Sequence, residues 1–411
     1  MNRFCFLLLP ALVFAFSCDF QKKSDELQSP SQWRNDRTGI YNETGLLKSW
    51  PEEGPELLWH YDGLGEGHSS VAISAGKIYV AGLYEGKGYL HVFDLDGNLL
   101  DKIMYGEEWT RNYVGTRGTP TIDNGRIYLI TGMGDLLCLD ENNPRTVIWK
   151  RNLIDDFESS NIRWGITESP LIIGDKLIAT PGGELHNVVA LDKHTGELIW
   201  SSPGKGELSA YCSPLYIGDQ ETPLIVTKTA YHILGLEAAT GKLLWSFESR
   251  NRNQIHSNTP LYHNNMVLCS SVDKGSIMLR LSDGGRKAEI VWESEELDNM
   301  MGGMMKVGDY IYGSDSGAKF RKWYCVKWDT GEILYRDDQL VVGVTIYADG
   351  MLYCYTDKGE MALVRPSTEK FDIVSQFMIT MGTAQHWAHP VIYRGVLYVR
   401  HGDTLMAYRI K

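Results

Sequence analysis

Residues 169–200 read SPLIIGDKLIATPGGELHNVVALDKHTGELIW, and this stretch decides the fold of the chain. Short apolar runs alternate with two turn signals, Gly-Asp at 174–175 and Asp-Lys-His-Thr-Gly at 192–196. Glycine adopts the positive φ that tight hairpins need, so these signals predict short antiparallel strands. Trp200 closes the stretch, and its large amphipathic ring suits packing between neighbouring sheets.

The same unit recurs along the whole chain. A close copy spans residues 213–245, beginning with Ser-Pro-Leu-Tyr-Ile-Gly-Asp and ending with Thr-Gly-Lys-Leu-Leu-Trp. Four strands in a unit of about 40 to 50 residues are typical of a propeller blade. Seven complete units begin near Val71, Pro120, Pro170, Pro214, Pro260, Met304 and Val344.

An eighth unit begins at Pro390, but the sequence ends at Lys411 after three strands. The missing outer strand lies near the other end, because ELLWHY at 56–61 matches KLLWSF at 242–247. Pairing this strand with the last three would close the ring and remove an exposed sheet edge. We therefore predict an all-β, eight-bladed β-propeller over residues 55–411, whose last blade is closed by an N-terminal strand.

The N-terminal residues are typical of a bacterial export signal. Arg3 is followed by an apolar run at 4–16 that is too short to span a bilayer as a helix. Ala-Phe-Ser-Cys at 15–18 resembles a loose lipobox, with a plain secretory peptide as the alternative. We predict a signal peptide at residues 1–17, a lipidated Cys18 with a flexible tether at 18–37, and a lead-in segment at 38–54. The protein is then an exported lipoprotein of the periplasm or outer membrane, held on the membrane by its lipid alone.

Charge and cysteine usage exclude several functions. The formal net charge is −12 and no long basic run occurs, which argues against a nucleic-acid partner. No Cys-x-x-Cys or Cys/His zinc spacing is present. Five cysteines of the repeats lie mostly in apolar strand contexts, and we expect them to be small core residues: Cys138, Cys212, Cys269, Cys325 and Cys354.

The Ala-x-Asp-x-x-Thr-Gly-x-x-x-Trp pattern of residues 190–200 resembles the repeat of pyrroloquinoline quinone (PQQ) proteins. Trp33-Arg34, the stretch from Trp164-Gly165 to 180–183, and residues 389–392 are similar to a narrower group, the bacterial PQQ-binding-like β-propeller proteins. Many of these are exported and most have no assigned activity. The resemblance covers about residues 33–411 and is specific for fold far more than for function.

The resemblance also indicates what a PQQ enzyme would need. Enzymes of the family use a vicinal disulfide over the quinone, a Ca²⁺ ion held by Glu and Asn, and a catalytic Asp. No Cys-Cys pair occurs in this sequence. Glu168 and Asn258 match the calcium ligands in residue type, and no aspartate matches the catalytic one. The identity of a cofactor, if the protein has one, is therefore unknown from the sequence. PQQ and calcium are the candidates to test.

Loops that precede the innermost strands open on one face of a propeller, where many blades converge on one concavity. Histidine or glutamate there would transfer protons or ligate metal, arginine would hold an anion or sugar hydroxyls, and tryptophan would stack on a ring. Polar rim contacts, interblade ion pairs and packing are the structural alternatives, and we assign no metal site. The candidate ligand-binding residues are His68, Arg117, Trp164, Glu168, His256, His386, Trp387 and His389.

Two functions are compatible with these features. The first is a noncatalytic envelope module, expected to be a monomer, that binds a glycan, a peptide or an envelope protein through the channel-mouth face. The alternative is an enzyme, either a quinoprotein-like oxidoreductase or another carbohydrate-active enzyme with a His/Arg/Glu site on the same face. The sequence does not decide between them.

Overall fold

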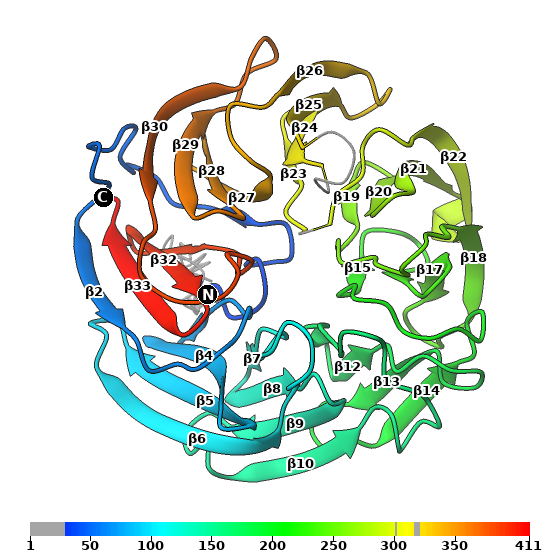
Figure 1. Cartoon of the computed structure of the whole chain (residues 1–411). Coiled ribbons are helices and arrows are strands. Elements are labelled where there is room, and N and C mark those ends of the chain that lie inside the picture. The colour runs from blue at the N-terminus through cyan, green and yellow to red at the C-terminus, as the bar shows by residue number, and fades with distance from the viewer. Residues whose placement is uncertain (1–28, 301, 316–320) are drawn as a thin grey trace, which may run out of the picture.

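A computed structural model describes residues 29–300, 302–315 and 321–411. Eight antiparallel sheets form a ring around a central channel (Figure 1). The structure thus confirms the predicted eight-bladed β-propeller. The predicted signal peptide, the predicted lipidation site Cys18 and the first part of the predicted tether fall at residues 1–28, outside the described residues.

Blades 1 to 4 follow one another along the chain, each running from the innermost to the outermost strand. Blade 1 contains β3 (Ala72–Ser74), β4 (Lys77–Tyr84), β5 (Lys87–Asp94) and β6 (Leu99–Glu107). Blade 2 contains β7 (Thr121–Asp123), β8 (Arg126–Ile130), β9 (Asp135–Asp140) and β10 (Val147–Asn152). Blade 3 contains β11 (Leu171–Ile173), β12 (Lys176–Ala179), β13 (Val188–Asp192) and β14 (Leu198–Ser202). Blade 4 contains β15 (Leu215–Ile217), β16 (Leu224–Lys228), β17 (His232–Glu237) and β18 (Leu243–Glu248).

Blades 5 to 8 complete the ring. Blade 5 contains β19 (Leu261–His263), β20 (Met266–Ser271), β21 (Gly275–Ser282) and β22 (Lys287–Ser294), with the short 3-10 helix η1 (Asp283–Gly285) between the last two. Blade 6 contains β23 (Met305–Val307), β24 (Tyr310–Ser314), β25 (Trp323–Lys327) and β26 (Ile333–Asp337). Blade 7 contains β27 (Gly343–Ala348), β28 (Met351–Thr356), β29 (Glu360–Arg365) and β30 (Asp372–Met378), and β1 (Ile40–Tyr41) joins it at β27. Blade 8 contains β31 (Val391–Tyr393), β32 (Val396–His401), β33 (Thr404–Arg409) and β2 (Leu57–Tyr61).

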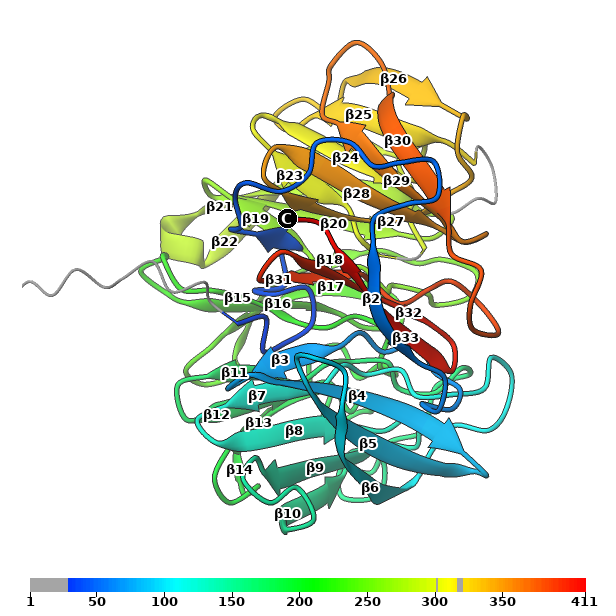
Figure 2. The ribbon, with the colours of Figure 1, turned by 90° about the vertical axis from the view of Figure 1, so that its left-hand side faces the viewer.

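Closure of the ring occurs in blade 8. Strand β2 pairs antiparallel with β33, and the register runs from Leu57 opposite Tyr408 to Tyr61 opposite Leu405. Figure 2 shows β2 beside β33 at the outer edge of the ring. The N-terminal strand therefore completes the last blade, as the sequence predicts, and β33 is not left as an open edge.

Tryptophans within the outer strands join several of the blades to the next one along the ring. Trp149 of β10 donates its indole Nε1–H to Lys193 O in blade 3 at 3.0 Å, and a Cβ on Gly196 would lie 2.8 Å from its ring. Trp59 and Trp292 make the same indole-to-carbonyl contact with the following blade. We call this tryptophan, with the Thr-Gly or equivalent turn it covers, the rim clasp. It explains why the repeat keeps Trp and Gly at its end.

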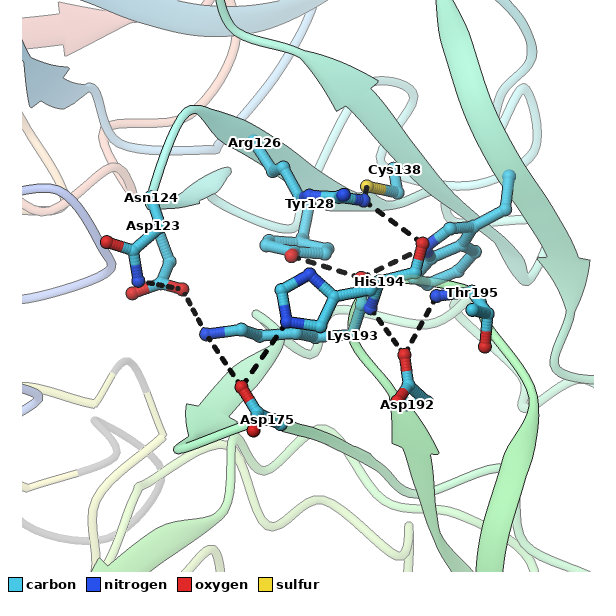
Figure 3. A network of polar contacts seen from close by, with 11 residues as sticks. Asp123, Asn124, Arg126, Tyr128, Cys138, Asp175, Asp192, Lys193, His194 and Thr195 are labelled. Carbon is cyan, nitrogen blue, oxygen red and sulfur yellow. Dashed lines mark hydrogen bonds and ion pairs between the residues drawn. The ribbon is translucent and has the colours of Figure 1, made fainter.

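Polar contacts reinforce the rim clasp between blades 2 and 3 (Figure 3). Lys193 Nζ lies 2.8 Å from Asp123 Oδ2, and Tyr128 donates its hydroxyl to Lys193 O at 3.1 Å. Arg126 donates to His194 O at 3.0 Å. Backbone carbonyls of one turn are thus held by side chains of the neighbouring blade, so that the interface is both apolar and hydrogen-bonded.

The repeat cysteines are core residues, as expected. All five repeat cysteines are buried and free, and Cys138, for example, packs between blades 2 and 3. No helix in the described ranges is long and apolar enough to cross a bilayer.

Residues 29–41 enter the channel, and we call them the channel segment. Pro30 O accepts a hydrogen bond from Ile73 N at 2.9 Å, and Ser31 O accepts one from Ile122 N at 2.8 Å. At its other end, β1 pairs in parallel with β27. The predicted flexible tether is therefore wrong for residues 29–37. This part of the chain is polar in sequence because it binds the blades through its main chain and two buried arginines.

Candidate functional site

A cavity of about 280 Å³ opens at one end of the channel. We call it the mouth cavity. The loops leading into the innermost strands supply most of its wall, because their blades converge there, and the channel segment adds Trp33. It is lined by Trp33, His68, Tyr113, Arg117, Trp164, Thr167, Ser169, Tyr211, Ser213, Ile255, Ser257, Met300, Trp387 and His389.

Aromatic rings form two groups in this wall. On one side the ring centroids of His68 and Tyr113 lie 5.1 and 5.0 Å from that of Trp387. On the other side Trp164 lies 5.9 Å from Tyr211. Most of these rings are only partly buried, so that their remaining surface is available to a ligand. Such rings combine a large contact area with a negatively polarised face.

Five of the eight predicted ligand-binding residues line this single cavity: His68, Arg117, Trp164, Trp387 and His389. They come from loops before four different blades, far apart in sequence. The structure therefore brings them together on one face of the ring. Their part in binding a ligand stays a prediction.

The other three predicted residues do not line the mouth cavity. Glu168 is fully buried, and its Oε2 accepts a hydrogen bond from Thr180 N at 3.0 Å. His256 is also fully buried, and its ring nitrogens lie 2.7 Å from Ser271 Oγ and 3.1 Å from Ala230 O. The His386 ring stacks on His401 with a centroid distance of 3.5 Å, and its Nδ1 lies 2.6 Å from Tyr355 Oη. Glu168 and His256 are thus enclosed by the blades, and the partly exposed His386 makes its contacts outside the cavity lining.

Sequence reasoning did not include two kinds of lining residue among the candidates. Trp33 was assigned to the tether, so that its place in the wall had no sequence signal beyond the family resemblance. Ser169 and Ser213 precede the prolines that begin two repeat units, and these positions were used only to count the units. A comparison of what stands before each innermost strand would have found these serines.

Four arginines lie around the mouth: Arg34, Arg37 and Arg400 are buried, and Arg117 is partly buried. Arg34 donates to Thr345 O and His389 Nδ1, and Arg400 donates to Ser69 O and Ala81 O. Within the described ranges, none of the four has a carboxylate oxygen within 4.0 Å. Backbone carbonyls, not carboxylates, therefore compensate most of this charge.

Burial shifts the ionisation of these groups and leaves the mouth positive. Loss of solvation lowers the pKa of each arginine to about 10, which keeps all four charged at neutral pH. Burial, helped by Arg117 and Arg400, lowers the pKa of His68 to about 3, so that its ring is neutral. Burial raises the pKa of Glu168 to about 8, although Thr180 and Arg37 oppose the shift. A desolvated carboxyl of this kind is largely protonated at neutral pH.

The residues below the mouth do not fit a calcium-PQQ site of the enzyme type. Ca²⁺ needs roughly six to eight oxygen ligands, several of them carboxylates. Glu168 has Arg37 as its charged neighbour, and Asn258 uses its amide to donate to Asn299 O. The charged neighbour of Glu168 is thus a guanidinium, and not a further carboxylate that could share a cation with it. Within the described residues, no group of three or more His, Cys, Asp or Glu side chains is placed to hold a metal ion.

Comparisons with known proteins agree with this architecture. The family described as outer membrane protein assembly factor BamB matches residues 184–316. BamB from Moraxella catarrhalis superposes with a TM-score of 0.63 at 15% identity, over 86% of this chain and 99% of that one. Quinohemoprotein alcohol dehydrogenase from Comamonas testosteroni gives 0.67 at 13%, over 93% and 80%. A europium-containing methanol dehydrogenase gives 0.62 at 15%, over 91% of each chain.

No curated protein matches the chain in sequence. The ring of repeats defines the chain as a β-propeller built from PQQ-type repeats. More particularly, its fold is the one seen in BamB and in the quinoprotein alcohol dehydrogenases. That fold is shared by an assembly factor and by dehydrogenases, so the likeness establishes the fold, and the activity has to be argued from the site.

Proposed function

We propose that this protein is a noncatalytic binding module of the cell envelope that takes up its ligand in the mouth cavity. One observation carries the proposal: five aromatic side chains and the Arg117 guanidinium meet in the wall of one cavity, where the blades converge. Ligand sites of proteins are concave, mostly apolar and furnished with a few polar groups, and the mouth cavity has these properties.

The ionisable groups near the cavity favour binding over catalysis. A general acid or base must lie within hydrogen-bond reach of its substrate. Glu168 and His256 are fully buried behind the wall. His68 does line the cavity, but its low pKa makes it a poor base at neutral pH. We therefore assign the mouth cavity to recognition, with Arg117 and the aromatic rings as its main contacts.

Binding can be measured on the purified full chain with a panel of oligosaccharides, peptides and envelope extracts by calorimetry. We expect Trp164→Ala to weaken binding at least tenfold. The matched control is Tyr84→Ala, since Tyr84 is half exposed at the end of β4 and does not line the cavity. Equal loss in both variants would contradict a site at the mouth. A quinone chromophore and dye-linked alcohol oxidation after addition of PQQ and Ca²⁺ would favour the oxidoreductase instead.

The envelope location rests on the sequence of residues 1–18. We propose processing before Cys18 and attachment of lipid there, as the lipobox-like Ala-Phe-Ser-Cys indicates. Cys18→Ala should then release the protein from the membrane fraction or block its maturation. Cys212→Ala is the control, because that thiol is buried in the propeller. A Cys18→Ala protein that is processed and membrane-bound as before would contradict the anchor.

A further inference from the structure

Charge in the mouth cavity is of the opposite sign to that of the protein as a whole. The chain carries a formal net charge of −12. Among the residues that line the cavity, however, Arg117 is the one with a permanent charge, and none is an aspartate or glutamate. Arg34 and Arg37 lie directly behind Trp33, where they line a small enclosed space with it. The site is therefore a positive spot on an acidic molecule.

Some arginine nitrogens in and near the wall of the mouth cavity have no hydrogen-bond acceptor. Arg117 Nη2 donates to Asn112 O at 3.2 Å and also to Tyr113 O, while its buried Nε has no partner. Nε and Nη1 of Arg37 are also buried without a partner. Buried polar groups of native proteins are nearly always satisfied, so groups left unsatisfied in a cavity wall point to a bound molecule or ordered water.

Hydroxyl groups supply further donors in the wall. Ser169 Oγ accepts from Thr119 N, and Ser213 Oγ accepts from Ser169 N, both at 3.0 Å. Within the described residues neither serine donates its own hydroxyl hydrogen, so both donors remain for a ligand oxygen. The cavity thus offers aromatic faces, hydroxyl donors and one guanidinium.

We infer that the mouth cavity selects an acidic sugar, a uronic acid residue at the end of a glycan. The inference rests on the proposed function and adds the class of ligand. Hydrogens on one face of a pyranose ring would contact the negative faces of Trp164 or Trp387. Ligand hydroxyls would accept from Ser169 and Ser213, and the carboxylate would take the charge-assisted hydrogen bonds of Arg117.

The size of the cavity limits the ligand to a chain end. Its volume of about 280 Å³ lies at the lower limit of ligand pockets, which run from roughly 300 to 1,000 Å³. One or two sugar rings fill such a space, and the rest of a polymer would leave through the open mouth. Recognition would therefore depend on the terminal residue and not on a long groove.

The test uses methyl β-glucuronide and methyl β-glucoside, which differ only in the carboxylate at C6. Calorimetry on the full chain should show at least tenfold tighter binding of the glucuronide. The variant Arg117→Gln should remove this preference, so that it binds the glucuronide and the glucoside with similar affinity. Arg145→Gln is the matched control, because Arg145 pairs with Asp101 at the surface, away from the cavity. Glucuronide binding unchanged in Arg117→Gln would overturn the inference.

Salt dependence gives a second measurement that needs no variant. Glucuronide affinity of the wild-type chain should fall when NaCl is raised from about 0.05 to 0.5 M, and glucoside affinity should not, because salt screens a charged contact. If the wild-type chain binds the two glycosides with equal affinity and Trp164→Ala binds neither, the inference of an acidic ligand is overturned. The proposal of a binding module is then retained. Binding of PQQ or benzoate without binding of either glycoside would overturn the sugar assignment. Failure of every probe would count against both proposals.

Discussion

The rim clasps and the mouth cavity are built from similar residue types and use them in opposite ways. At the rim, Trp149 covers the turn at Gly196, its indole has an acceptor, and Lys193 pairs with Asp123. At the mouth, by contrast, Arg117 keeps a buried donor without a partner, and neither ring nitrogen of His68 has one. The rim clasp of Trp149 is satisfied by the neighbouring blade, whereas Arg117 and His68 at the mouth keep unsatisfied nitrogens. Departures from the rules that the scaffold follows are expected at a functional site.

Removal of the closing strand should produce the largest effect. Deleting residues 55–63 takes away β2 and the rim clasp of Trp59, and leaves β33 as an open edge. We expect a loss of unfolding free energy comparable to the whole stability of a domain, about 5–15 kcal/mol, and hence aggregation or loss of cooperative unfolding. Urea denaturation measures it, with a deletion of residues 19–28 as the control. Similar stability of the two deletions would refute closure by β2.

A pair of tryptophan substitutions tests the comparison directly. Trp149→Ala should lower the free energy of unfolding by about 3–5 kcal/mol, because it empties a packed interblade site and removes a hydrogen bond. Trp164→Ala should cost less than about 1 kcal/mol, since that ring is partly exposed in the cavity wall. Denaturant midpoints of both variants give the answer. Equal costs would mean that the mouth aromatics are packing residues like those of the rim.

The smallest expected effect is the change in unfolding free energy per pH unit that results from the titration of Glu168. Its pKa of about 8 in the folded state lies above its ordinary value of 4.5, so the folded protein holds a proton that the unfolded chain releases. The stability from this group is fully present below pH 4.5 and is lost as pH rises toward 8, by at most about 1.4 kcal/mol per unit. Glu168→Gln should flatten this decline in urea midpoints between pH 5 and 8. A variant with the slope of the wild-type chain would place the titration elsewhere.

The sequence predicted the scaffold because the scaffold repeats. Tryptophan and the Thr-Gly turn recur at the ends of the units, and the count of units, the closure at residues 56–61 and the face of the cavity followed from them. It could not place Glu168 or His256, since a position before an innermost strand does not determine whether the side chain points into the channel or between strands. The packing of residues 29–37 against the blades was not predicted for another reason: main-chain hydrogen bonds leave no hydrophobic pattern in the sequence.

The channel segment also sets how the molecule would stand on a surface. Ser29 donates its hydroxyl to Tyr393 Oη at 3.0 Å, at the end of β31 away from the mouth. A lipid on Cys18 would leave ten residues, 19–28, before Ser29, and these reach at most about 35 Å when fully extended. A lipid anchor would then attach on the face of the propeller opposite the mouth cavity. That face would lie toward the membrane, and the mouth cavity would open toward the surrounding compartment. The ends of soluble polymers could then reach the mouth cavity. Lipid headgroups of the anchoring membrane could not, because they would lie on the opposite side of the propeller.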